Sequence, residues 1–132
     1  MKGGWEQQDA VGEVIDRLEK VVPDPDQVVE VLPEKWNPRS SPPMIVVQSD
    51  GTPVTSKGWT RETIRIRVQA RTLPQAMKAM RQLDSFLLTP GLVLLGLSIL
   101  PGVGIMGGPD SLLGGFYSSA TYRVAMPRKA IW

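Results

Sequence analysis

An alternating segment that runs directly into an amphipathic helix constrains the fold of this chain more than any other feature. Residues 62–71 separate apolar from mostly basic side chains with a period of two. One side holds Ile64, Ile66, Val68 and Ala70, and the other holds Arg65, Arg67, Gln69 and Arg71. The pattern predicts a strand with one face in the core and an arginine-bearing face turned to a partner or to water.

The residues that follow carry the signals of a helix over 74–88. Thr72 can cap its N-terminus, Pro74 suits its first turn, and Thr89-Pro90-Gly91 ends it. Its apolar stripe consists of Ala76, Met77, Met80, Leu83 and Leu87. Because this strand–helix unit shows no arrangement of catalytic residues, it favours binding or assembly over chemistry.

Composition removes most catalytic chemistries. The 132 residues include no cysteine and no histidine, so thiolate metal sites, Ser-His-Asp hydrolysis and ordinary zinc or iron sites are not available. With 15 basic and 13 acidic residues, the net charge of +2 gives no global attraction to nucleic acid or an anionic membrane. We expect no enzyme activity, no catalytic or metal-binding residues and no cofactor.

Neither a signal segment nor a membrane span is predicted. The first residues lack an apolar signal region. The most apolar window, residues 92–100, is about half of the ~20 residues that a helix needs to cross a bilayer. We therefore expect a soluble protein without membrane contact.

The remaining patterns predict one α+β domain over residues 1–132, in the order α-β-β-β-α-β-β. Asp9 can cap a helix over 11–22 that Pro23 ends. Further strands are expected at 27–33, 44–48, 92–100 and 116–126, and 44–48 is apolar enough to be central. We expect one mostly antiparallel sheet of four to five strands with two helices on one face. The segments 34–43, 49–60 and 102–115 read as loops, the last two mobile, and 127–132 as a short C-terminal tail.

Two motifs could carry chemistry, and for each a turn or loop is the favoured interpretation. Gly102, Gly104 and Gly107 have the spacing of a dinucleotide-binding loop, but Gly108-Pro109 follows them instead of a helical pattern. Asp24, Asp26 and Asp110 could hold magnesium or act as acid and base. Each of them lies beside a proline, however, where aspartate is an ordinary turn former.

The arginine-bearing strand face has three interpretations. Arg61, Arg65, Arg67 and Arg71 could contact a partner or a second subunit, could simply be solvated, or could bind phosphates. Partner contact is favoured, because a nucleic-acid sheet of the RNA-recognition type should also show stacking aromatics on this face. Trp59, in a predicted loop, and Trp132, at the end of the sequence, are further candidates for an interface.

The order of these elements resembles the tail-terminator proteins of long-tailed bacteriophages, especially those of actinobacterial hosts. In the first half of the chain, the resemblance rests on Pro23-Asp24-Pro25-Asp26 after the first helix and on the strand ending at Val31-Leu32-Pro33. It rests further on residues 65–70, which run into an Ala-, Met- and Arg-rich helix. Towards the end of the chain, it rests on Pro109-Asp110-Ser111 after the glycine-rich loop and on the closing alternating strand 116–124. It covers nearly the whole chain. The apolar run 92–100 and the glycine-rich 102–115 depart from the family's pattern.

The resemblance implies a structural virion protein whose ring, commonly a homohexamer, caps the head-proximal end of the tail tube. Its partners would be the tail tube protein and a head-completion or connector protein, with DNA passing through the ring lumen without specific binding. The protein would be assembled in the host cytoplasm. Interface residues would then be Arg61, Arg65, Arg67, Arg71, Trp59, Asp110 and Trp132. Alternatives are another head–tail connector or minor tail protein, or a small nucleic-acid-binding module that uses Arg65, Arg67 and Arg71.

Overall fold

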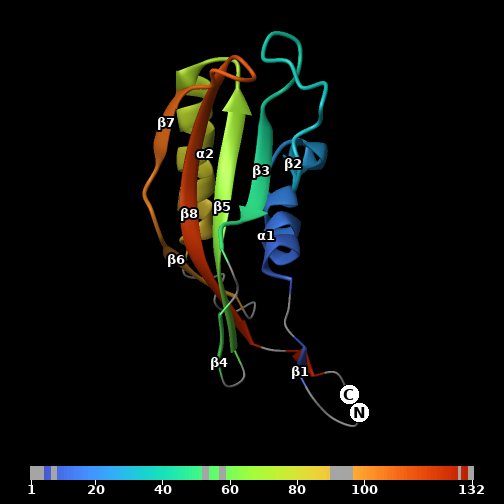
Figure 1. Ribbon diagram of the computed structural model, residues 1–132, viewed down its shortest axis with the longest axis vertical. Helices are drawn as coiled ribbons and strands as arrows, with labels where there is room; N and C mark the ends of the chain where they lie inside the picture. Colours follow the sequence, from blue (N-terminus) through green and yellow to red (C-terminus); the bar gives the residue numbers. More distant parts are fainter. Residues whose placement is uncertain are drawn as a thin grey trace.

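The fold is built on one long, twisted antiparallel ladder (Figure 1). The computed structural model describes residues 5–6, 9–51, 54–56, 59–89, 97–127 and 129–130. Its elements are β1 (Trp5–Glu6), α1 (Ala10–Glu19), the 3-10 turn η1 (Pro25–Gln27), β2 (Val28–Val29), β3 (Met44–Ser49), β4 (Val54–Ser56), β5 (Trp59–Ala70), α2 (Leu73–Leu87), β6 (Ser98–Pro101), β7 (Met106–Pro109), β8 (Phe116–Pro127) and β9 (Lys129–Ala130).

The main sheet has the strand order β2-β3-β5-β8-β6, and all of its pairs are antiparallel except β2 with β3. The ladder of β5 with β8 runs from Trp59 opposite Pro127 to Ala70 opposite Phe116. The short strands β4 and β7 add to β5 and β8. The predicted class, an α+β domain with a mostly antiparallel sheet, is confirmed.

Several segments differ from the prediction in their boundaries. The predicted loops 49–60 and 102–115 contain the strands β4 and β7, because the long strands β5 and β8 leave backbone groups for them to pair with. In the predicted strand 27–33 only Val28–Val29 is a strand. In the predicted tail 127–132, β9 pairs with β1. Of the predicted strand 92–100, residues 92–96 lie outside the described residues, and β6 forms its end.

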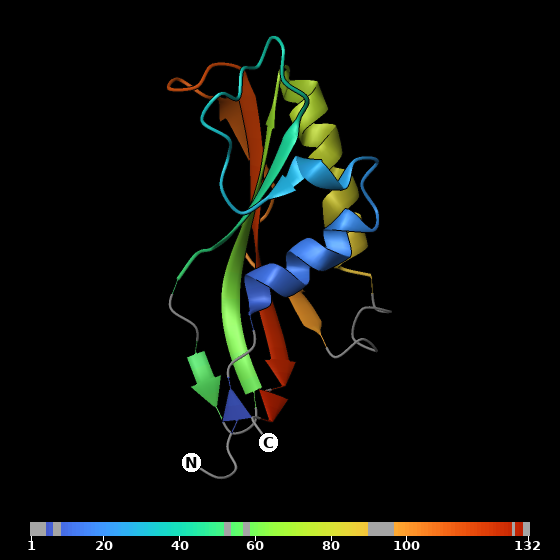
Figure 2. The same ribbon diagram turned by 90° about the vertical axis from the view of Figure 1, so that its right-hand side faces the viewer.

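Both helices begin at the predicted caps. The Asp9 carboxylate accepts the N–H of Gly12 at 3.1 Å, and the Thr72 hydroxyl accepts the N–H of Gln75 at 3.3 Å. The first helix ends at Glu19, before the predicted residue 22, because the N–H groups of Lys20 and Val21 donate to the carbonyls three residues back, those of Arg17 and Leu18, in a tighter last turn. Figure 2 shows that α1 and α2 lie on the same side of the sheet, as predicted.

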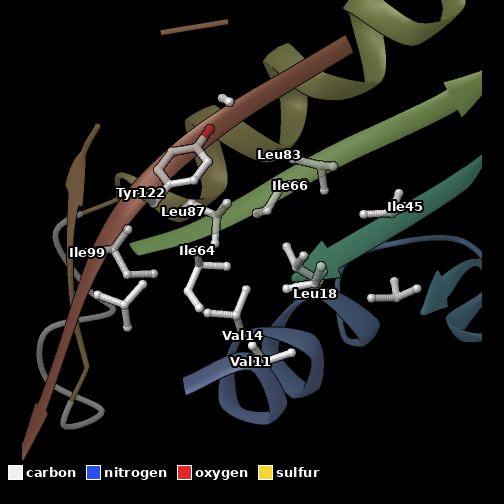
Figure 3. Close-up of a cluster of buried hydrophobic side chains, with 14 of the residues drawn as sticks. Val11, Val14, Leu18, Ile45, Ile64, Ile66, Leu83, Leu87, Ile99 and Tyr122 are labelled. Atoms are coloured by element: carbon white, nitrogen blue, oxygen red, sulfur yellow. The ribbon is translucent and has the colours of Figure 1, made fainter. Parts of the chain in front are cut away.

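The core lies between this pair of helices and the apolar face of the sheet (Figure 3). Ile64 and Ile66 of β5 are fully buried against Leu18 of α1 and Leu87 of α2. Burial of each such side chain contributes about 1.5–3 kcal/mol. The Tyr122 hydroxyl donates to Asp84 Oδ1 at 2.6 Å, and burial together with this hydrogen bond raises the pKa of Tyr122 above its usual range. The tyrosine therefore stays a neutral hydrogen-bond donor that ties β8 to α2.

Candidate functional site

The sheet face turned away from the helices carries the candidate site, and we call it the arginine face. Because side chains alternate along a strand, Arg61, Arg65 and Arg67 project opposite to the buried Ile64 and Ile66. Residues directly opposite in an antiparallel ladder share a face. Arg123, which lies opposite Thr63, therefore joins the arginine face from β8.

One end of this face, which we call the Asp110 end, is held by a single buried carboxylate. Asp110 Oδ2 accepts hydrogen bonds from Arg67 Nη2 at 3.0 Å and from Gln69 Nε2 at 3.2 Å. Asp110 Oδ1 accepts the backbone N–H groups of Leu112 and Leu113, both at 3.0 Å. The Asp110 side chain is only 8% exposed. This carboxylate therefore joins β5 to the turn 110–115.

Electrostatics keep Asp110 ionised. Burial by itself favours the neutral carboxyl, but the hydrogen bonds from Leu113, Leu112, Gln69 and Arg67 outweigh it and lower the pKa of Asp110 below its ordinary value. The Arg67 guanidinium also lies over the Tyr117 ring, 4.0 Å from its centroid. Arg67 is thus occupied on two sides by groups of its own chain.

Arg65 also has a carboxylate of its own chain. Its Nη2 lies 3.1 Å from Asp50 Oδ2, in a pair whose side chains are 45% and 37% exposed. Such an exposed pair contributes little stability. Arg65 and Arg67 were both predicted to meet a partner, and that assignment stays a prediction. Arg67, whose side chain is 33% exposed, would have to share its guanidinium between Asp110, Tyr117 and any partner.

The opposite end of the face, which we call the open end, has a different character. Arg61 and Arg123 are exposed, and neither has an ion-pair partner among the residues that the structure describes. They line a cleft of about 560 Å³ together with Leu100, which is 53% exposed. Trp59, 45% exposed, lies on the same face at the start of β5. Arginine, aromatic and aliphatic side chains in one exposed patch are typical of protein interfaces.

The other predicted site residues lie in separate places. The prediction that Trp59 lies in a loop was wrong. Trp59 belongs to strand β5, because β4 and β8 both pair with that end of β5. Arg71 is exposed one residue beyond β5. Trp132 lies outside the described residues. Trp36, the other tryptophan of a predicted loop, is buried, and its Nε1 donates to the Pro42 carbonyl at 3.0 Å.

Sequence reasoning missed two parts of this surface. Arg123 was not among the predicted interface residues, because only the register of β8 on β5 places it diagonally across from Arg61. Leu112 and Leu113 were overlooked, although they are 93% and 46% exposed. A useful signal was present, since two leucines between Asp110 and Gly114 are unusual in a turn.

The two motifs with possible chemistry form local structure. Asp24 accepts the N–H of Asp26 at the start of η1, so the turn interpretation is confirmed there as it is for Asp110. Gly107 lies in β7, and a Cβ on it would come within 2.7 Å of Met77 Sδ and 2.9 Å of the Tyr117 carbonyl oxygen. Close backbone packing accounts for this glycine, and strand β8 follows the segment instead of a phosphate-binding helix.

Within the described parts of the chain, no group of three or more acidic residues is placed to hold a metal ion. Neither α1 nor α2, which are the described α-helices, is long and apolar enough to cross a membrane. No protein-family model matches the chain, and no curated protein matches its sequence.

Proposed function

We propose that this chain is a tail-terminator subunit of a long-tailed bacteriophage. In this proposal several copies, commonly six, close into a ring at the head-proximal end of the tail tube. The ring ends tube polymerisation and offers the surface that joins tail to head. Its partners are the tail tube protein and a head-completion or connector protein, and the role is structural instead of enzymatic.

The observation that carries the proposal is the open end of the arginine face. Arg61 and Arg123 form no ion pair among the described residues, although Glu62 lines the same cleft, and they lie next to exposed Trp59 and Leu100. Exposed apolar groups beside unpaired arginines suit a partner that supplies both carboxylates and apolar contact. The order of elements that resembles tail terminators supports the same role.

At the Asp110 end, the arrangement of the face argues against a nucleic-acid-binding module, whereas the exposed Trp59 beside Arg61 and Arg123 leaves the open end to the binding experiment. Two of the three arginines in that alternative, Arg65 and Arg67, already face Asp50 and Asp110. The aromatic ring of Tyr117, which could have stacked on a base, is covered by the Arg67 guanidinium. Phosphates would have to compete with buried or preorganised carboxylates on this part of the face.

Solution mass and binding together test the proposal. Native mass spectrometry and negative-stain imaging of the full chain should give a discrete closed ring of about six copies. Binding to a fluorescent single-stranded oligonucleotide should be absent or weak at physiological salt. A protein that stays monomeric at all concentrations would overturn the proposal, and oligonucleotide binding whose affinity falls steeply with salt would favour the nucleic-acid-binding alternative.

A further inference from the structure

Charge is divided unevenly along this chain. Residues 1–34 contain nine acidic and three basic residues, whereas residues 35–132 contain four acidic and twelve basic ones. The acidic part forms α1, η1 and β2, and the basic part supplies β5, α2 and β8. Two copies of such a chain attract each other when the acidic part of one meets the basic part of the next.

The acidic part borders an apolar cleft. A hollow of about 570 Å³ lies between the end of α1 and helix α2, and its walls include Val21, Val22, Pro23, Ala79 and Phe86. Val21 is 47% exposed. The exposed Asp24 and Asp26 lie between Pro23 and Gln27, which both line this cleft. The α1–β2 wall of the cleft is therefore apolar inside and acidic at its rim.

The basic part carries a rigid apolar projection, the turn 110–115. Leu112 at its tip is 93% exposed and Leu113 is 46% exposed. The turn is held by two backbone hydrogen bonds between Asp110 and Gly114–Gly115, and by the Asp110 carboxylate on the N–H groups of both leucines. Gly114 and Gly115 take the positive φ values, 78° and 70°, that the turn requires. Little backbone conformational entropy remains to be lost when this turn binds.

Positive charge flanks the two leucines. A Cβ on Gly115 would approach both the Ala70 carbonyl oxygen and Pro38, so these two residues border the turn. Arg71 and Arg39 follow them directly in sequence, and both are exposed. Among the described residues neither arginine has a carboxylate within ion-pair distance. The projection is thus apolar at its tip and basic at its base, which complements the cleft.

We infer that the turn 110–115 of one copy inserts Leu112 and Leu113 into the α1–α2 cleft of a second copy, with Arg39 and Arg71 facing Asp24 and Asp26. Figure 2 shows the turn and the two helices on opposite sides of the sheet, so a copy cannot fill its own cleft. Contact between two different surfaces is heterologous, and it closes a ring when the repeated rotation returns to the first copy. The inference rests on the proposed self-assembly and names the surfaces that carry it.

Two single variants and their mixture test the contact. Leu112→Asp alters the projection, and Ala79→Trp fills the cleft; each should weaken self-association by about 30-fold or more, as seen for central interface residues. In sedimentation velocity each variant alone should be monomeric. Mixed in equal amounts they should form a dimer only, because the intact cleft of one accepts the intact turn of the other. Val103→Asp, at another exposed aliphatic residue, should assemble as the wild type does.

Exchanging the charges supplies a second measurement that does not depend on filling the cleft. Asp24→Lys with Asp26→Lys should weaken assembly, and adding Arg39→Asp with Arg71→Asp should restore it. If the wild type forms rings and the Leu112→Asp variant forms the same rings, this contact is wrong and the proposed function still stands. A wild-type chain that never exceeds a monomer would overturn both.

Discussion

The two ends of the arginine face put the same residue type to different uses. At the Asp110 end, Arg67 is 33% exposed, pairs with a buried carboxylate and covers Tyr117. At the open end, Arg61 and Arg123 have no carboxylate partner among the described residues. A row of arginines on one strand face is therefore not one functional unit. One end maintains the fold, and the other is available to a partner.

The difference arises from the segments that return to each end. Strand β7 and the turn 110–115 bring Asp110 over Gln69 and Arg67, and Pro38 of the preceding loop borders the same turn. Met44 and Val46, on the arginine face of β3, are buried there. At the open end, by contrast, the neighbouring Leu100 and Trp59 are each about half exposed. Coverage, not residue type, decides which arginines can meet a partner.

The largest stability effect should come from Asp110. Asp110→Ala removes four hydrogen bonds and leaves Arg67 without its carboxylate, so we expect a loss of about 3 kcal/mol. This is at the lower limit of the range for fully buried pairs because Arg67 is a third exposed. Urea unfolding at neutral pH measures the loss.

The matched control is Asp50→Ala, which removes the carboxylate partner of Arg65. Because this pair is exposed to solvent, its removal should cost less than about 0.5 kcal/mol. If the two alanine variants lost equal stability, the distinction between a structural and an exposed arginine pair would be wrong.

A smaller effect should appear as a pH dependence of the same carboxylate. The pKa of Asp110 in the folded chain lies below its ordinary value of 3.8, so ionised Asp110 contributes stability that is fully present above that value. The contribution should be lost as the pH falls below 3.8 and through the folded pKa. The difference in unfolding free energy between wild type and Asp110→Asn should stay constant from pH 7 to pH 5, and then shrink in more acidic solution. A difference that grows on acidification would contradict the lowered pKa.

Local signals account for the elements that could be predicted from the sequence. Strand β5 has a clean alternation, and α2 has Thr72 as its cap and apolar residues at helical spacing. Strand β7 could not be predicted, because Met106-Gly107-Gly108-Pro109 contains poor strand formers and becomes a strand only by pairing with β8. The arginine face was predicted correctly as a face. The division of this face into the Asp110 end and the open end was not predicted, because Arg67 and Asp110 are 43 residues apart and only the fold joins them.

The smallest stability effect is expected at the open end, and it is the sharpest contrast with Asp110. Arg61 lies opposite Ala125 and Arg123 opposite Thr63, so the two arginines are diagonal neighbours across the ladder, where like charges repel weakly. Arg61→Gln with Arg123→Gln should leave the free energy of unfolding unchanged or raise it by up to about 0.5 kcal/mol in the same urea experiment. A loss above about 1 kcal/mol would show that these arginines also maintain the fold. If stability is kept or gained, the two like charges do not serve folding, and partner contact and plain solvation are the interpretations that remain for them.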